Sequence, residues 1–271
     1  MEQLAGLGKM DRERLAAVIR ETKGTVSVAD AAKALKVFPS SAAKMLARWA
    51  SKGWLSRVRR GLYIPVPLES RTADAPLEDP WLIAERLYAP CYIGGWSAAE
   101  YWDFTEQIFR TVIVITTRNP RDRTPVIRGA TFMLRTVPEK NMFGLKSAWR
   151  GQVKISVSDP ARTILDMLDD PRLGGGIRST TDIFLNYLQS KNRDIELLLD
   201  YADRLGNGAV FKRLGFLLER FAGEEKPAIE ACRSRLTQGN AKLDTSLTAD
   251  RLVTRWRLWV PRAWAEESSI D

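Results

Sequence analysis

The spacing of apolar residues predicts two short helices at the start of the chain. The first has its apolar residues on one face, and we expect Asp11 to cap it and the helix to run to about Lys23. Ser27-Val-Ala-Asp30 has the pattern of a capping box, in which side chains and backbone N–H groups bond reciprocally. This pattern predicts a second helix over about Val28–Leu35.

A third helix is expected over about Ser41–Lys52, after a tight turn that ends at Pro39. We expect Ser40 to cap this helix and Gly53 to end it. Its apolar residues share one face, and the opposite face carries short hydroxyl and cationic side chains. The polar face consists of Ser41, Lys44, Arg48 and Ser51.

The next stretch, GWLSRVRRGLYIP at Gly53–Pro65, predicts a β-hairpin. Trp54–Val58 and Leu62–Ile64 are apolar enough to form its strands, and Arg59-Arg60-Gly61 is the turn between them. Glycine at the last turn position is free to adopt a positive φ. Three helices followed by a basic hairpin are typical of a winged helix-turn-helix domain.

The distribution of charge points to nucleic acid as the partner of this domain. Residues 1–64 hold 13 Lys and Arg against 5 Asp and Glu, residues 65–177 are neutral overall, and residues 178–271 carry +1. A basic module joined to neutral ones favours DNA binding, with a winged helix used for protein contact as the alternative. The predicted DNA contacts are Ser40, Ser41, Lys44, Arg48, Lys52, Arg57, Arg59 and Arg60.

The pattern changes after the hairpin. Residues 67–78 are rich in proline without periodicity, so we expect a linker between a winged-helix domain at 1–66 and a second domain at 79–271. Helices are expected to start at Asp79-Pro80 and Asp159-Pro160, and Ser97-Ala-Ala-Glu100 has the pattern of a capping box. Predicted strands are Thr111–Thr117, Ala130–Thr136 and Val153–Val157, within a sheet of three to five strands in a part at about 79–172.

A mainly helical part is expected at about 177–240. Its predicted helices are Thr181–Lys191, Asp194–Leu205, Ala209–Ala222 and Ala228–Leu236. We interpret their basic residues, Arg204, Lys212, Arg213 and Arg220, as a solvated face, with contact to a partner as the alternative. Arg255–Val260 alternates like a strand and is a candidate to rejoin the sheet. The predicted class is therefore α+β, a winged helix-turn-helix followed by a mixed α/β domain that ends in a helical region.

Composition narrows the chemistry that the chain can perform. Histidine is absent, and Cys91 and Cys232 are the only cysteines, which removes the commonest general base and argues against a zinc site. Two distant cysteines and no signal-peptide pattern favour reduced thiols in a cytoplasm. No apolar run approaches the roughly 20 residues that cross a bilayer, so we expect no membrane partner.

Two sequence patterns of metal-dependent catalysis are incomplete, because the predicted strands lack the acidic residues that each requires. Gly94-Gly95-Trp96-Ser97 has the composition of a phosphate-binding turn in nucleotidyltransferases, but the strand after it lacks the carboxylates that hold Mg²⁺. The acidic residue and Glu-x-Lys pattern of restriction-type nucleases are missing as well. We therefore expect no enzyme, no catalytic residue, no cofactor and no metal, and interpret Trp96, Tyr101 and Trp102 as core residues.

Four stretches together resemble the AbiEi-type antitoxins, the predicted transcriptional regulators of bacterial viral-defence (phage-defence) systems. The stretches are GWLSRVRRGLYIP, YIGGWSAAEYW at Tyr92–Trp102, VSDPARTILDML at Val157–Leu168 and LGNGAVFKRLGFLLER within Asp200–Arg220. Their order and spacing agree with that family over nearly the whole chain. One departure is the turn Lys36-Val-Phe-Pro-Ser40, which is less polar than usual.

The resemblance implies a winged helix that represses its own operon and a C-terminal domain that neutralises a co-encoded, nucleotidyltransferase-like toxin. As a type IV antitoxin, the protein would counter the toxin with or without a stable complex. The implied DNA partner is the protein's own promoter, with repeated sites on double-stranded DNA. The alternative is a solitary regulator whose C-terminal domain binds a ligand or oligomerises. The oligomeric state and the neutralising residues stay open.

Overall fold

The chain divides into two compact units in a computed structural model. The structure describes residues 8–22, 25–66, 79–127, 129–151 and 153–266. One unit consists of Met1–Ala89, Pro120–Met133 and Ala148–Ile155, and the other of Pro90–Asn119, Leu134–Ser147 and Ser156–Asp271. The predicted linker, 67–78, lies outside the described residues, and the predicted domain boundaries stay predictions.

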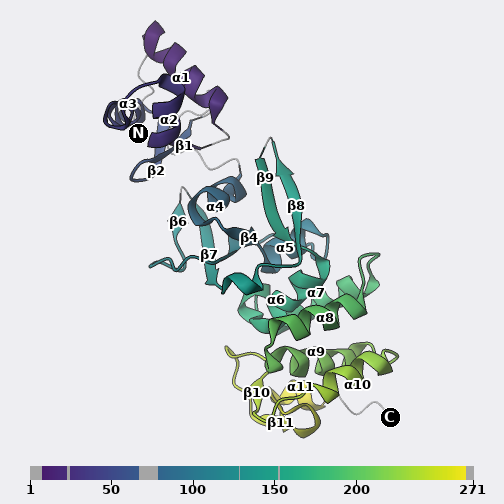
Figure 1. Cartoon of the computed structure of the whole chain (residues 1–271). Helices are drawn as coiled ribbons and strands as arrows, with labels where there is room; N and C mark the ends of the chain where they lie inside the picture. The colour runs from purple at the N-terminus through teal and green to yellow at the C-terminus, as the bar shows by residue number, and fades with distance from the viewer. Residues whose placement is uncertain (1–7, 23–24, 67–78, 128, 152, 267–271) are drawn as a thin grey trace. The chain divides into compact units, whose positions relative to one another are not determined.

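The N-terminal domain, residues 8–66, has the helices and the hairpin that the sequence predicts (Figure 1). Its elements are α1 (Lys9–Glu21), β1 (Val26–Ser27), α2 (Val28–Leu35), α3 (Pro39–Ser51), β2 (Leu55–Arg59) and β3 (Leu62–Pro65). The strands form an antiparallel sheet in the order β1-β3-β2. This sequence of elements is a winged helix-turn-helix, and the predicted α+β class is confirmed.

Every element of this domain contributes to one apolar core. The buried core residues are Leu15, Val18, Val26, Ala31, Ala42, Leu46, Trp49, Leu55 and Tyr63. Val26 comes from β1, a strand too short for its alternation to be recognised in the sequence. Trp54 packs against this core while Tyr63 is part of it, so both aromatic residues of the hairpin serve packing.

The capping box of α2 is confirmed, but two other helix starts differ from the prediction. Ser27 Oγ accepts a hydrogen bond from the Asp30 backbone N–H at 3.1 Å, and Asp30 accepts one from the Ser27 N–H at 3.0 Å. The cap of α1 is Gly8, so Asp11 lies in the first turn. The cap of α3 is Phe38 rather than Ser40, because proline suits the first helical position, where no N–H is needed.

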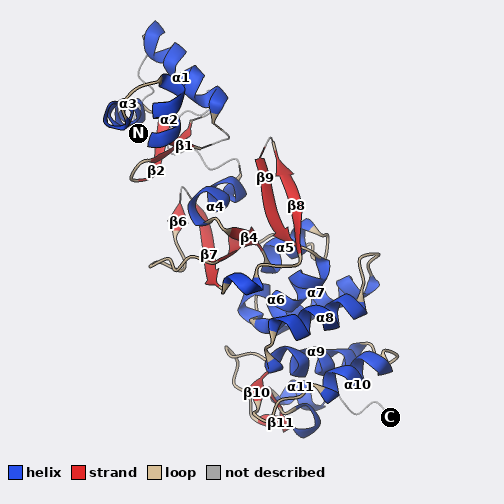
Figure 2. Cartoon of the chain, viewed as in Figure 1, coloured by secondary structure: helices blue, strands red, loops and turns tan. Residues whose placement is uncertain are grey.

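The second part of the chain contains a mixed sheet with the strand order β6-β7-β5-β4-β9-β8 (Figure 2). The strands are β4 (Cys91–Ile93), β5 (Thr111–Thr116), β6 (Val126–Ile127), β7 (Ala130–Thr136), β8 (Leu145–Arg150) and β9 (Val153–Ser158). Six strands exceed the predicted three to five. The predicted β5, β7 and β9 are confirmed, whereas β4 and β6 are too short and β8 too polar to give a strand pattern.

The helical part follows the prediction closely. The α-helices of the sheet-containing part are α4 (Pro80–Tyr88), α5 (Gly95–Tyr101) and α6 (Pro160–Asp169). Those that follow are α7 (Ile177–Gln189), α8 (Ile195–Leu205), α9 (Gly208–Phe221), α10 (Lys226–Ser234) and, near the end of the chain, α11 (Arg262–Glu266). Short 3₁₀ turns are η1 (Glu139–Asn141), η2 (Pro171–Gly174) and η3 (Thr254–Trp256). Asp79 and Asp159 cap α4 and α6 as expected. Ser97 does not cap α5, since it lies inside that helix and accepts from the Ile113 N–H.

The predicted return of Arg255–Val260 to the large sheet is wrong. The strands β10 (Ala241–Lys242), β11 (Arg251–Val253) and β12 (Leu258–Val260) form a separate small sheet in the order β10-β12-β11. The turn η3 and a positive φ of 50° at Arg257 interrupt the alternating stretch. This sheet packs on α9, where a Cβ at Gly215 would lie 2.1 Å from the Trp256 ring, so glycine is required there.

Candidate nucleic-acid interface

The polar face predicted for the third helix is present on α3. Its exposed residues are Ser40, Ser41, Lys44, Ala47, Arg48 and Ser51. They recur every three or four positions, while Ala42, Leu46 and Trp49 on the opposite face are buried in the core. The helix has no acidic residue. Four of the eight predicted DNA contacts therefore share one exposed helix face.

Arg48 differs from the other cation on this face because it has a partner. Its Nη2 donates to a carboxylate oxygen of Asp11, on α1, at 2.7 Å. The side chain of Arg48 is still 51% exposed, and an exposed ion pair of this kind contributes only about 0–1 kcal/mol. Asp11 therefore positions Arg48, and the pair is weak enough for a phosphate to replace Asp11 as the partner of Arg48.

Lys52 lies outside the exposed helix face. It follows the last helical residue, is half-buried, and its backbone N–H donates to the Arg48 carbonyl at 3.2 Å. Among the residues that the structure describes, Lys44, Arg57 and Arg60 have no ion-pair partner, in contrast to Arg48. These three cations can neutralise phosphates without first losing a protein contact.

The wing is the hairpin of β2 and β3. Its register shifts by a bulge between Arg57 and Arg59, and Gly61 adopts a positive φ of 78° at the turn, as predicted. The Gly61 carbonyl accepts from the Val28 N–H at 3.2 Å, which fastens the turn to the start of α2. Arg57 is exposed on β2 and Arg60 is exposed at the turn. Arg59 is the last residue of β2, and its side chain is outside the described part of the structure.

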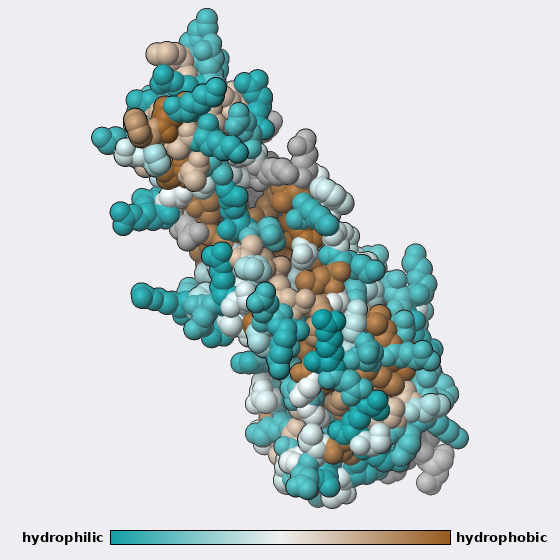
Figure 3. All heavy atoms as spheres, in the orientation of Figure 1, coloured by the Kyte–Doolittle hydropathy of each residue, from teal (hydrophilic) through white to brown (hydrophobic). Residues whose placement is uncertain are grey.

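Two residues of the α3 region were missed by sequence reasoning. Phe38 is 81% exposed at the start of α3, and Ala47 is exposed in the middle of the polar face. Figure 3 shows hydrophilic side chains over most of the visible surface of this domain, with a few apolar groups among them. The only sequence signal for Phe38 was the low polarity of its turn, which does not say whether valine or phenylalanine faces the core.

The other motif considered for chemistry, Gly94-Gly95, is explained by packing. A Cβ at Gly94 would lie 2.6 Å from Ile115 Cδ1, and one at Gly95 would lie 2.4 Å from the Leu173 carbonyl oxygen. Protein atoms thus fill the space beside the turn. Trp96 is buried as expected, whereas Tyr101 is exposed. Among the described residues, no group of three or more acidic, cysteine or histidine side chains is arranged to hold a metal ion.

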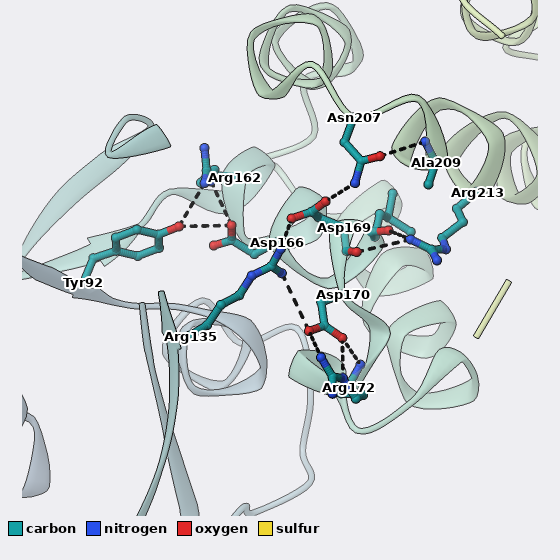
Figure 4. Close-up of polar contacts among 11 residues, drawn as sticks. Tyr92, Arg135, Arg162, Asp166, Asp169, Asp170, Arg172, Asn207, Ala209 and Arg213 are labelled. Carbon is teal, nitrogen blue, oxygen red and sulfur yellow. Dashed lines mark hydrogen bonds and ion pairs between the residues drawn. The ribbon is translucent and has the colours of Figure 1, made fainter. Parts of the chain in front are cut away.

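A buried polar network of Tyr92, Arg162 and Asp166 lies close to Gly94, where an added Cβ would come within 3.1 Å of Asp166 Oδ2. Figure 4 shows this network. Arg162, on α6, donates from Nε to Asp166 at 2.9 Å and from Nη2 to the Tyr92 hydroxyl at 3.0 Å, and that hydroxyl donates to Asp166 at 3.1 Å. The Arg162 guanidinium also lies 4.3 Å from the centre of the Phe143 ring. Burial raises the pKa of Asp166, although Arg162 and Arg135 oppose this, and burial raises the pKa of Tyr92 well above its ordinary value.

The acidic residues at the end of α6 are also engaged by protein groups. Asp169 pairs with Arg135 and accepts from Asn207, and Asp170 pairs with Arg172 at 2.7 Å (Figure 4). The carboxylates of this region therefore hold α6, η2 and the start of α9 together.

The predicted solvated basic face of the C-terminal helices is wrong for two of its members. Lys212 and Arg213 are buried on α9. Lys212 donates to Thr237 Oγ1 at 2.9 Å, and Arg213 donates to the carbonyls of Leu168 and Lys242, each at 2.7 Å. Their hydrogen bonds join α9 to the end of α6 and to the small sheet, so their role is structural.

Comparison with known proteins finds a similarity in the N-terminal domain. No helix in the described ranges has the length and apolar character that spanning a membrane requires. No curated protein matches the chain. A family model described as "Transcriptional regulator, AbiEi antitoxin" matches residues 13–66, which cover nearly the whole winged helix. Residues 13–66 are thus similar to a transcriptional-regulator domain of AbiEi antitoxins.

Proposed function

We propose that this protein is a repressor of its own promoter and the antitoxin of a toxin–antitoxin operon that acts in phage defence. The observation that carries the proposal is the exposed, acid-free face of α3, on a domain that matches a transcriptional-regulator family. The second part of the chain would neutralise a nucleotidyltransferase-like toxin in the cytoplasm. The protein itself would perform no catalysis and require no cofactor.

DNA binding would use two kinds of contact. The N-terminal end of α3 enters the major groove, where Ser41 and Lys44 reach base edges and Ser40 and Arg48 reach phosphates. The wing arginines contact the sugar-phosphate backbone beside the groove and add affinity without reading sequence. Occupation of the promoter by this domain then excludes RNA polymerase.

The DNA-binding part is tested with a duplex that spans the region upstream of the protein's own gene. We expect the full chain to bind it in fluorescence anisotropy with an affinity that falls steeply with salt, and to bind a scrambled duplex about 10³-fold or more weakly. The logarithm of the affinity should fall with that of the salt concentration with a slope of about −0.9 for each phosphate contacted. Equal affinity for both duplexes would contradict a specific operator.

The antitoxin part is tested by co-expression. The gene adjacent to this one, if it encodes a nucleotidyltransferase-like protein, is placed under an unrelated inducible promoter so that repression does not contribute. Growth arrest should be relieved by the full chain and equally by a chain carrying Arg57→Ala and Arg60→Ala, since neutralisation is assigned to the other part of the molecule. Growth arrest that persists with an expressed, DNA-binding chain would favour a solitary regulator.

A further inference from the structure

Phe38 is a large aromatic side chain that the N-terminal domain leaves in solvent. It is 81% exposed, whereas the preceding Val37 packs against the core. Lys36 adopts a left-handed conformation with a φ of 53° at the end of α2, so the helix ends before these two residues. The domain therefore uses Val37 for packing and leaves Phe38 outside.

The backbone at Phe38 is fixed by the helix that it caps. Its carbonyl accepts hydrogen bonds from the N–H groups of Ser41 at 2.9 Å and Ala42 at 3.0 Å. Pro39 at the first helical position further restricts the turn. The aromatic ring is thus held at the N-terminal end of α3, next to the exposed Ser40 and Ser41.

This end of a recognition helix is the part that meets base edges in a helix-turn-helix complex. A phenyl ring has no donor or acceptor for a base edge, but it can make apolar contact with the C5 methyl group of thymine in the major groove. The exposed Ala47, about two and a half turns after Phe38, offers no long side chain that would hold the helix away from the bases.

We propose that Phe38 is a specificity-determining residue that contacts the C5 methyl group of a thymine in the operator. The inference rests on the proposed DNA-binding function and deepens it. It adds an apolar contact from the turn to the base-edge contacts of Ser41 and Lys44, while Arg48 and the wing arginines supply the salt-dependent affinity. Phe38 makes no ion pair with DNA, so its replacement alters selectivity without altering the salt slope.

The test begins with selection of duplexes from a random library by the full chain. In the enriched duplex each thymine is replaced in turn by deoxyuridine, which removes only the methyl group. We expect one such replacement per binding site to weaken binding about threefold to fivefold, the loss that corresponds to one buried methyl group. The Phe38→Ala chain should bind the thymine and deoxyuridine duplexes equally, with an unchanged salt slope.

Ile108→Ala is the matched control, because Ile108 is 83% exposed and lies outside the N-terminal domain. It should keep the full difference between thymine and deoxyuridine. Phe38 is absent from the core, so the thermal midpoint of the Phe38→Ala chain should equal that of the unchanged protein.

The outcomes separate this inference from the proposed function. Specific, salt-dependent binding with no effect of any deoxyuridine overturns the role of Phe38 and leaves the DNA-binding function standing. Unchanged DNA affinities of Phe38→Ala together with an altered sedimentation behaviour would make Phe38 a protein contact, which also overturns the inference. Absence of both enrichment and salt-dependent binding overturns the proposed function and this inference with it.

Discussion

Alanine at both Arg57 and Arg60 is expected to weaken binding of the operator duplex about 60-fold at about 0.1 M salt. Both side chains are exposed on the wing, and each would neutralise one phosphate and release about 0.9 of a counterion. Lowering the salt concentration from 1 M to about 0.1 M thus raises the affinity about eightfold for each phosphate contact. Without the two contacts, the slope of log affinity against log salt concentration should become smaller in magnitude by about 1.8. Anisotropy titrations at four salt concentrations measure both quantities.

A second double variant, Arg12→Ala with Arg20→Ala, is the control for this experiment. Both arginines are exposed on α1, so the variant removes the same charge from the same domain outside the wing and α3. We expect its slope to stay within about 0.5 of the unchanged protein, because these side chains would contact no phosphate. Equal losses in the two double variants would show that binding follows net charge, and the assignment of the wing would then be wrong.

Arg162→Met is expected to destabilise the unit that contains α6 by about 3–5 kcal/mol, because it leaves Asp166 as a buried charge without its partner. Arg162 is only 1% exposed and bonds both Asp166 and the Tyr92 hydroxyl. Hydrogen exchange of the α6 backbone amides, together with urea unfolding followed by circular dichroism, measures the loss.

The pair itself is isolated by a double-mutant cycle. Arg162→Met combined with Asp166→Leu removes both charges, and we expect the double variant to lose clearly less stability than the sum of the two single losses. Arg172→Met is the matched control, because Arg172 also pairs with an aspartate but its side chain is 66% exposed. Its loss should stay below about 1 kcal/mol. Equal losses for Arg162→Met and Arg172→Met would contradict a stabilising role of the buried network.

Local signals in the sequence were sufficient for much of the secondary structure. The Ser27 capping box, the Asp-Pro helix starts and the glycine of the wing turn act through bonds and dihedral angles within a few residues. The polar face of α3 follows from helical periodicity alone. Each of these features was predictable because its physical cause is contained in one short segment.

The sequence also misled where two local rules competed. Serine at position 40 is a good cap, but Pro39 before it takes the first helical position and moves the cap to Phe38. The alternation in Arg255–Val260 suggested a single strand, but a 3₁₀ turn and a left-handed residue divide it. In both cases the residue types favoured one local structure, and the conformation of neighbouring residues decided that another formed.

By itself, the sequence determined a basic winged helix with a cationic face on its third helix, because periodicity, capping and charge are properties of the chain at short range. Only the tertiary structure decided which side chains are free for a partner. It pairs Arg48 with Asp11, buries Lys212 and Arg213 against carbonyl groups, and leaves Phe38 in solvent. These outcomes depend on contacts between residues far apart in the chain, which no local pattern specifies.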